Sequence, residues 1–108
     1  MKIAPVAHST LARSVAERLL DLVVDGTVAP GEKMLSERAL MDKLQVGRST
    51  VREALSNLAS YGIVEIRPGV GTFVLPNALE LVPHARASLQ AAKEGLSPVA
   101  VPTAALFR

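Results

Sequence analysis

The sequence predicts a mainly α-helical domain that ends in a small β-hairpin, an α+β fold in which three helices come before the hairpin. Apolar residues recur at helical spacing in three segments between residues 11 and 61. The spacing then changes to that of β-strands, around a turn with two glycines at residues 68–71. Because only 3% of the residues are aromatic, the core must be built from leucine, valine, isoleucine and alanine.

The first helix is expected at residues 11–25, where apolar residues form two rows with a spacing of four. The rows are Leu11, Val15 and Leu19, and Ala12, Ala16, Leu20 and Val24. Together they make one wide stripe, which is typical of a helix buried on one side. Ser9 or Thr10 can cap its start, and Gly26 suits its end. A turn at residues 28–31 and a very short strand at 33–35 should follow.

The second helix should begin after Ser36, a good N-cap residue, and run to about Leu44 with Leu40 and Leu44 facing inward. A tight connection at residues 45–47 leads to the third helix, at about 48–61, which Gly62 ends. Apolar residues of the third helix follow the spacing of one buried face. They are Val51, Ala54, Leu55, Leu58 and Ala59, and we expect Leu55 and Leu58 to be buried between the helices.

Two strands, at residues 63–66 and 72–75, follow the third helix directly. Most of their residues are β-branched, aromatic or apolar, and the glycine-rich turn between them favours a hairpin. Three helices, a tight turn between the second and third, and a hairpin at the end describe a winged helix-turn-helix.

The chain divides into two parts on this interpretation. Residues 1–76 form the winged helix-turn-helix domain, and residues 77–108 are a linker with a short helical appendage. Pro83 should start a helix that runs to about Glu94, because proline suits the first position of a helix, and Gly95 should close it. Residues 97–108 contain many alanines and no clear period.

Composition excludes several kinds of site. The chain has no cysteine, which excludes disulfides and thiolate metal sites and fits a cytoplasmic protein. His8 and His84 lie far apart without a carboxylate at ligand spacing, so we expect no metal and no cofactor. No apolar run reaches the ~18 residues of a membrane span. We also find no nucleophile–base pair, paired carboxylates or phosphate loop, and we therefore expect no enzyme.

The outward face of the predicted third helix is polar. Arg48 and Arg52 are four residues apart and lie on nearly the same side, with Arg48 at the end that a helix-turn-helix points into the major groove. Arginine donates two hydrogen bonds to guanine, the commonest specific base contact. Exposed arginines are usually only solvated, but the tight turn before this helix and the hairpin after it favour DNA. The alternative is a winged helix used for protein contacts, which would need an apolar outward face.

Three segments resemble the GntR family of bacterial transcription regulators. Residues 30–38 (PGEKMLSER) are similar to the family's PGxxLPSER element, and residues 46–55 (VGRSTVREAL) to its VSRxTVREAL recognition helix. Gly62 and residues 68–74 (PGVGTFV) resemble its G…GxGTFV wing. The three come in the family's order and cover about residues 11–75. Two positions differ: Leu35 stands where the family usually has proline, and Gly47 where it has a capping serine.

The resemblance implies a set of DNA contacts. Arg48 and Arg52 would read bases, mostly guanines, from the major groove, and Arg38 at the start of the second helix would also contact DNA. Ser49 and Thr50 would hold phosphates. In the wing, at residues 63–75, Gly69 would enter the minor groove.

The resemblance also implies partners. A short palindromic operator in double-stranded DNA would be read by two copies, so we expect a homodimer at least on DNA, with a monomer or weak dimer in solution. Regulation as a repressor is the expected outcome. A small-molecule effector would bind a C-terminal domain for which residues 77–108 are too few, although Leu79, Leu81, Val82, Leu89 and Leu96 are possible contacts between copies.

Overall fold

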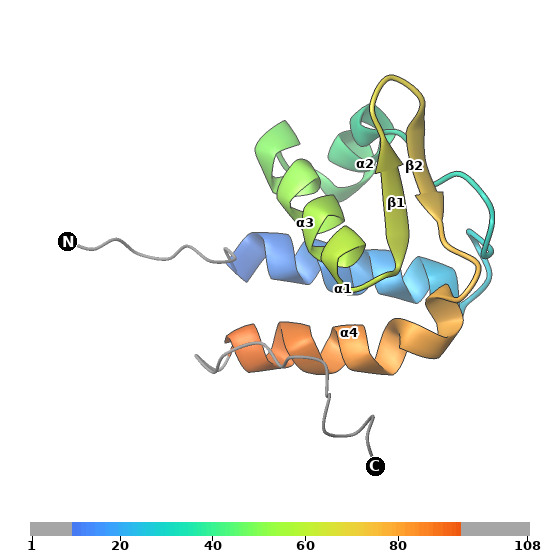
Figure 1. Ribbon diagram of the computed structural model, residues 1–108. Helices are drawn as coiled ribbons and strands as arrows, with labels where there is room; N and C mark the ends of the chain where they lie inside the picture. Colours follow the sequence, from blue (N-terminus) through green and yellow to red (C-terminus); the bar gives the residue numbers. More distant parts are fainter. Residues whose placement is uncertain (1–9, 94–108) are drawn as a thin grey trace, which may run out of the picture.

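The computed structural model describes residues 10–93. In chain order its elements are α1 (Thr10–Val24), α2 (Glu37–Leu44), α3 (Arg48–Ser60), β1 (Val64–Arg67), β2 (Gly71–Val74) and α4 (Ala78–Lys93). The winged helix-turn-helix predicted from the sequence is confirmed, and its helices and strands begin and end within one residue of the expected positions. Figure 1 shows α2, α3 and the hairpin on one side of α1, with α4 on the other side.

Helix α1 is buried along most of its length and contacts both α3 and α4. Its buried residues are Ala12, Val15, Ala16, Leu19, Leu20 and Val23. The predicted stripe is therefore correct in its middle but wrong at its ends, because Leu11 is 51% and Val24 54% exposed. Both lie at the ends of the helix, where no other described element covers them.

The helix-turn-helix is formed by local backbone interactions that the sequence predicts. The hydroxyl of Ser36 accepts a hydrogen bond from the backbone N–H of Ala39 at 3.0 Å, so it caps α2. Gln45 ends α2 in the left-handed region, with φ +56°, and its N–H donates to the carbonyl of Met41. Val51, Ala54, Leu55 and Leu58 of α3 are all buried, as the apolar spacing predicts. The outward face of α3 is thereby set.

The hairpin is an antiparallel pair that an additional segment extends. In the register of the hairpin, Val64 pairs with Val74 and Arg67 with Gly71. Both valines are buried in the core. The segment before α2 runs along the other edge of β2, where Lys33 forms an isolated bridge with Phe73. The very short strand expected at residues 33–35 is thus present as this single bridge, and β2 lies between two partners.

Helix α4 begins five residues earlier than the sequence predicts, because Pro83 lies inside the helix and does not start it. A proline inside a helix removes one backbone hydrogen bond and bends the helix, and α4 bends near its N-terminal end (Figure 1). Ala78, 0% exposed, and Val82, 6% exposed, pack into the core ahead of the proline. Their burial offsets the free-energy cost of a proline inside the helix. The periodicity of the sequence alone does not reveal this burial.

Helix α4 shares one core with α1. From the sequence, we expected residues 77–108 to be a linker with a short helical appendage. Ala85 and Leu89 belong to the same buried cluster as Leu19 and Leu58. Arg86 of α4 also donates hydrogen bonds to Glu17 and Asp21 of α1, both at 2.7 Å. The bonds to these carboxylates, that to Asp21 above all, raise the pKa of Arg86, while desolvation opposes this.

Burial in this core removes two of the predicted contacts between copies. Val82 and Leu89 are buried in the chain's own core, whereas Leu79 is 49% exposed. Leu96, Gly95 and the end expected at Glu94 lie outside the described residues, as does His8.

We predict that Leu89→Ala lowers the free energy of unfolding by about 2–5 kcal/mol, because it removes a fully buried leucine from the contact between α1 and α4. Leu79→Ala, on the exposed side of the same helix, should change it by less than about 0.5 kcal/mol. Urea unfolding measured by circular dichroism compares the two. Equal effects of the two substitutions would mean that α4 does not pack on α1 as described.

Candidate nucleic-acid interface

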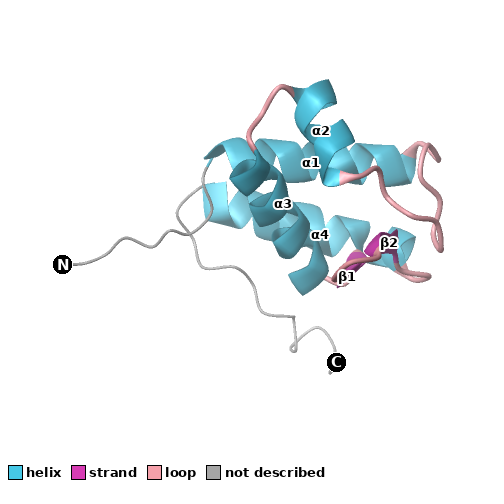
Figure 2. Ribbon diagram, turned by 90° about the horizontal axis from the view of Figure 1, so that it is seen from above, coloured by secondary structure: helices cyan, strands magenta, loops and turns pink. Residues whose placement is uncertain are grey.

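The exposed face of α3 carries the residues that the sequence predicts to read DNA. Arg48 and Ser49 lie exposed in its first turn, Thr50 is half-buried, and the side chain of Arg52 is 67% exposed. The opposite face of the helix is buried against the core. Figure 2 shows α3 beside both α2 and the hairpin, and α3 contacts both α2 and β1.

A hollow of about 340 Å³ lies between the start of α2 and the hairpin. Arg52 and Gly69, which the sequence predicts as separate contacts, both line it. The hollow does not include Arg38, which is exposed in the first turn of α2, or the three polar residues of the first turn of α3. Two further cations, Lys33 and Arg67, do line it. Neither was predicted from the sequence.

Arg52 forms an ion pair with Glu37 of α2, with its Nε 3.5 Å from the Glu37 Oε2. The pair links α3 to the start of α2. Since the two side chains are 67% and 39% exposed, water screens the interaction and its contribution to stability is small. A guanidinium held this loosely can exchange its carboxylate partner for the edge of a base.

The hairpin presents a bare glycine tip and a braced arginine. Gly69 is exposed, has φ +77°, and a Cβ at this position would meet nothing within 4 Å. Behind the tip, the guanidinium of Arg67 lies 4.6 Å from the centre of the Phe73 ring and 3.1 Å from the carboxylate of Glu65. Two partners thus hold Arg67 on the outer face of the hairpin.

Gly47 stands at the N-cap of α3 and makes no side-chain capping bond. Its backbone is extended, with φ −82° and ψ 169°, a conformation that any residue adopts. The glycine therefore serves no conformational need here, and the first turn of α3 has one fewer partner for its backbone N–H groups than a serine would give it.

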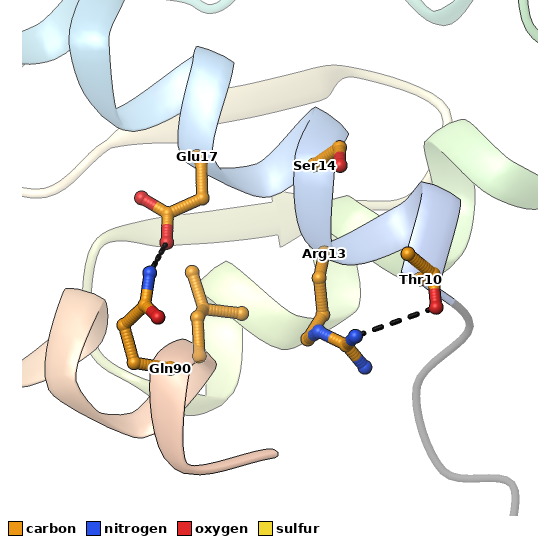
Figure 3. A pocket seen from close by; sticks show the side chains of 6 residues that line it. Thr10, Arg13, Ser14, Glu17 and Gln90 are labelled. Atoms are coloured by element: carbon orange, nitrogen blue, oxygen red, sulfur yellow. Dashed lines mark hydrogen bonds between the residues drawn. The ribbon is translucent and has the colours of Figure 1, made fainter. Parts of the chain in front are cut away.

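Two other hollows lie away from these residues. One of about 430 Å³ is mostly apolar and lies between α1 and α2, where Leu22, Leu35 and Leu44 line it. Leu35, which stands where the family usually has proline, thus forms part of the apolar lining of this hollow. The other, of about 140 Å³, lies between α1 and α4, where Gln90 donates to Glu17 at 3.4 Å (Figure 3). Neither includes a predicted DNA contact.

Within residues 10–93, no group of three or more acidic, histidine or cysteine side chains is placed to hold a metal ion. None of the helices in this part of the chain is long and apolar enough to cross a membrane. His84 instead packs its ring edge-on against Tyr61, with the ring centres 6.2 Å apart.

A helix-turn-helix with a polar outward face and an adjoining glycine-tipped hairpin defines the DNA-binding module of a transcription regulator. The family model described as bacterial regulatory proteins, gntR family, matches residues 11–74. The chain therefore belongs to the gntR family, as its sequence motifs indicate. This is a family of transcriptional regulators and not of enzymes.

Relatives and solved structures agree with this membership. The chain is 38% identical over 73 residues to the Bacillus subtilis regulator YcbG, and 40% identical over 74 residues to the Mycobacterium tuberculosis regulator Mce2R. Each match covers 68% of this chain and 31% of the relative, so the chain spans about a third of the length of these curated relatives.

Among solved structures, GntR of Streptococcus agalactiae is 39% identical over 62% of this chain and 32% of its own, with a TM-score of 0.57. The AraR DNA-binding domain in complex with operator ORX1 is 29% identical, with a TM-score of 0.58 over 68% of this chain and 92% of its own. A gntR-family regulator from Listeria monocytogenes shares the fold over 95% of this chain and 96% of its own, with a TM-score of 0.65 at 20% identity.

We predict that Gly47→Ser raises the free energy of unfolding by about 0.5 kcal/mol, because serine restores the cap of α3 and restricts the unfolded chain. A Cβ at this position meets nothing within 4 Å. The melting temperature should rise by about 2–4 °C.

The contrasting variant is Gly62→Ser. Gly62 has φ +81°, and a Cβ there would lie 2.8 Å from Leu81 Cδ1. This substitution should therefore lower the free energy of unfolding by about 1–2 kcal/mol. A fall in melting temperature for Gly47→Ser as well would contradict the cap assignment.

Proposed function

We propose that this chain binds a specific sequence of double-stranded DNA and acts as the DNA-binding part of a transcriptional repressor. In this proposal the N-terminal half of α3 lies in the major groove and the hairpin lies at the minor groove. The observation that carries it is the outward face of α3, where Arg48, Ser49 and Arg52 are exposed beside the hairpin tip. The similarity to the AraR DNA-binding domain, which was solved in complex with operator ORX1, supports binding to DNA.

Each predicted site residue has a role in this arrangement. Arg48 and Arg52 read base edges, since guanidinium groups pair in a bidentate manner with guanine. Ser49 and Thr50 hold phosphates at the start of α3, where free backbone N–H groups attract anions. Arg38 contacts the DNA from the first turn of α2, and the bare backbone of Gly69 enters the minor groove.

The alternative of a protein-binding winged helix finds less support. Such a module would present an apolar outward face on α3, but the exposed residues there are Arg48, Ser49, Arg52, Ser56 and Ser60. Binding to random duplex DNA at two salt concentrations separates the two functions. A DNA-binding domain loses affinity steeply as salt rises, because phosphate contacts release counterions.

We predict that Arg48→Ala and Arg52→Ala each weaken binding to the preferred site by about 1–3 kcal/mol and relax the preference at one base pair. Selection of bound sequences from a random duplex pool supplies the site, and titration against single-base variants of it measures the preference. Ser56→Ala, on the outward face further along α3, is the control. An equal loss on all sequences would instead make that arginine a phosphate contact.

We also propose that two copies read a palindromic operator, with an effector bound by a further domain of the full-length regulator. We predict a monomer or weak dimer at micromolar concentration that binds a palindrome cooperatively and a half-site weakly. Analytical ultracentrifugation measures the first, and titration of whole and half operators the second. A tight dimer without DNA would contradict the prediction.

A further inference from the structure

Lys33 reaches the hairpin from the segment before α2, which is remote in sequence from β2. This segment is joined to β2 by backbone hydrogen bonds: the N–H of Met34 donates to the carbonyl of Thr72 at 2.7 Å, and that of Val74 to Glu32 at 2.9 Å. Lys33 itself bridges Phe73. Residues paired across strands share a face, so Lys33, Phe73 and Glu65 lie in one row on the outer face.

The side chain of Lys33 runs along this face toward the tip of the hairpin. A Cβ built on Gly71 would overlap the Lys33 Cε and would lie 3.3 Å from its Nζ. The stem of the lysine therefore lies directly on the backbone of Gly71, in the space that any other residue would fill. Gly71 follows the turn, so the ammonium group lies at the base of the tip that contains Gly69.

The two cations of the hairpin differ in their partners. Arg67 is held by the carboxylate of Glu65 and the ring of Phe73. Lys33 is exposed, and no ion pair among the described residues includes it. An ammonium on a flexible stem is a strongly hydrated point charge, which suits a phosphate better than the edge of a base.

We propose that Lys33 is a phosphate contact of the wing. Because Gly71 has no side chain, the stem of Lys33 can lie over its backbone and reach the base of the hairpin tip. This inference rests on the proposed DNA binding. Lys33 lines the same hollow as Arg52 and Gly69, which are the proposed major-groove and minor-groove contacts. Phosphates flank both grooves at such a position. The contact strengthens binding to every sequence equally, because phosphates carry no sequence information.

The test measures the affinity of Lys33→Gln for a random-sequence duplex at several salt concentrations. Loss of one phosphate contact should reduce the slope of log affinity against log salt by about 0.9 per bound chain. At about 0.15 M salt this corresponds to a loss of about fivefold. The loss should be the same on the preferred site and on random duplex.

Lys43→Gln is the matched control. Lys43 is also exposed, but it lines the hollow between α1 and α2 and not the one beside the hairpin. Its substitution should leave the slope unchanged. Lys33→Met keeps an unbranched stem over Gly71 and removes only the charge, so it should match Lys33→Gln, whereas Lys33→Arg should keep the wild-type slope.

An unchanged slope for Lys33→Gln, or a loss confined to the preferred site, overturns the inference while DNA binding by the wild-type chain stands. A loss for Lys33→Arg equal to that of Lys33→Gln also overturns it, since the charge would then not be the cause. If the wild-type chain itself shows no salt-dependent binding to duplex DNA, the proposed function fails, and this inference fails with it.

Discussion

Helix α1 packs against α3 on one side and α4 on the other, and the positions of the other elements depend on this double contact. Six of its residues are buried, from Ala12 to Val23. Four of the six are valine or leucine, so α1 supplies much of a core that contains little aromatic material. A helix covered on two sides cannot turn about its axis without exposing apolar surface, which disfavours any other orientation by the hydrophobic effect. The helices on either side of it are held accordingly.

The outward face of α3 follows from that constraint. The buried face of α3 consists of Val51, Ala54, Leu55 and Leu58. Because Arg48 and Arg52 lie on the exposed face of the helix, they must point away from α1. The ion pair between Arg52 and Glu37 then links this face to α2. The polar surface is thus positioned by apolar contacts on its far side, and the charged residues themselves contribute little to holding it.

The hairpin is held in two ways. Val64 and Val74 anchor its base in the core, and the segment before α2 pairs along the free edge of β2. The second contact covers an edge that would otherwise expose unpaired backbone groups. It also places the stem of Lys33 on Gly71, so that a residue remote in sequence contributes its charge to the tip. Figure 1 shows how this leaves the hairpin projecting beside α2 and α3.

The sequence by itself determined the elements and the faces they bury, because helical and strand spacing, caps and turn glycines are local signals. The bounds of α1 to β2, the cap at Ser36 and the inward face of α3 could all be predicted in this way. Only the tertiary structure decided which surface covers each face. Local spacing made Pro83 the start of a helix, but burial of Ala78 and Val82 against the core extends α4 ahead of it. The contact between Lys33 and Gly71 could not be predicted from the sequence either. It arises from strand pairing between distant segments, and no local pattern encodes such a contact.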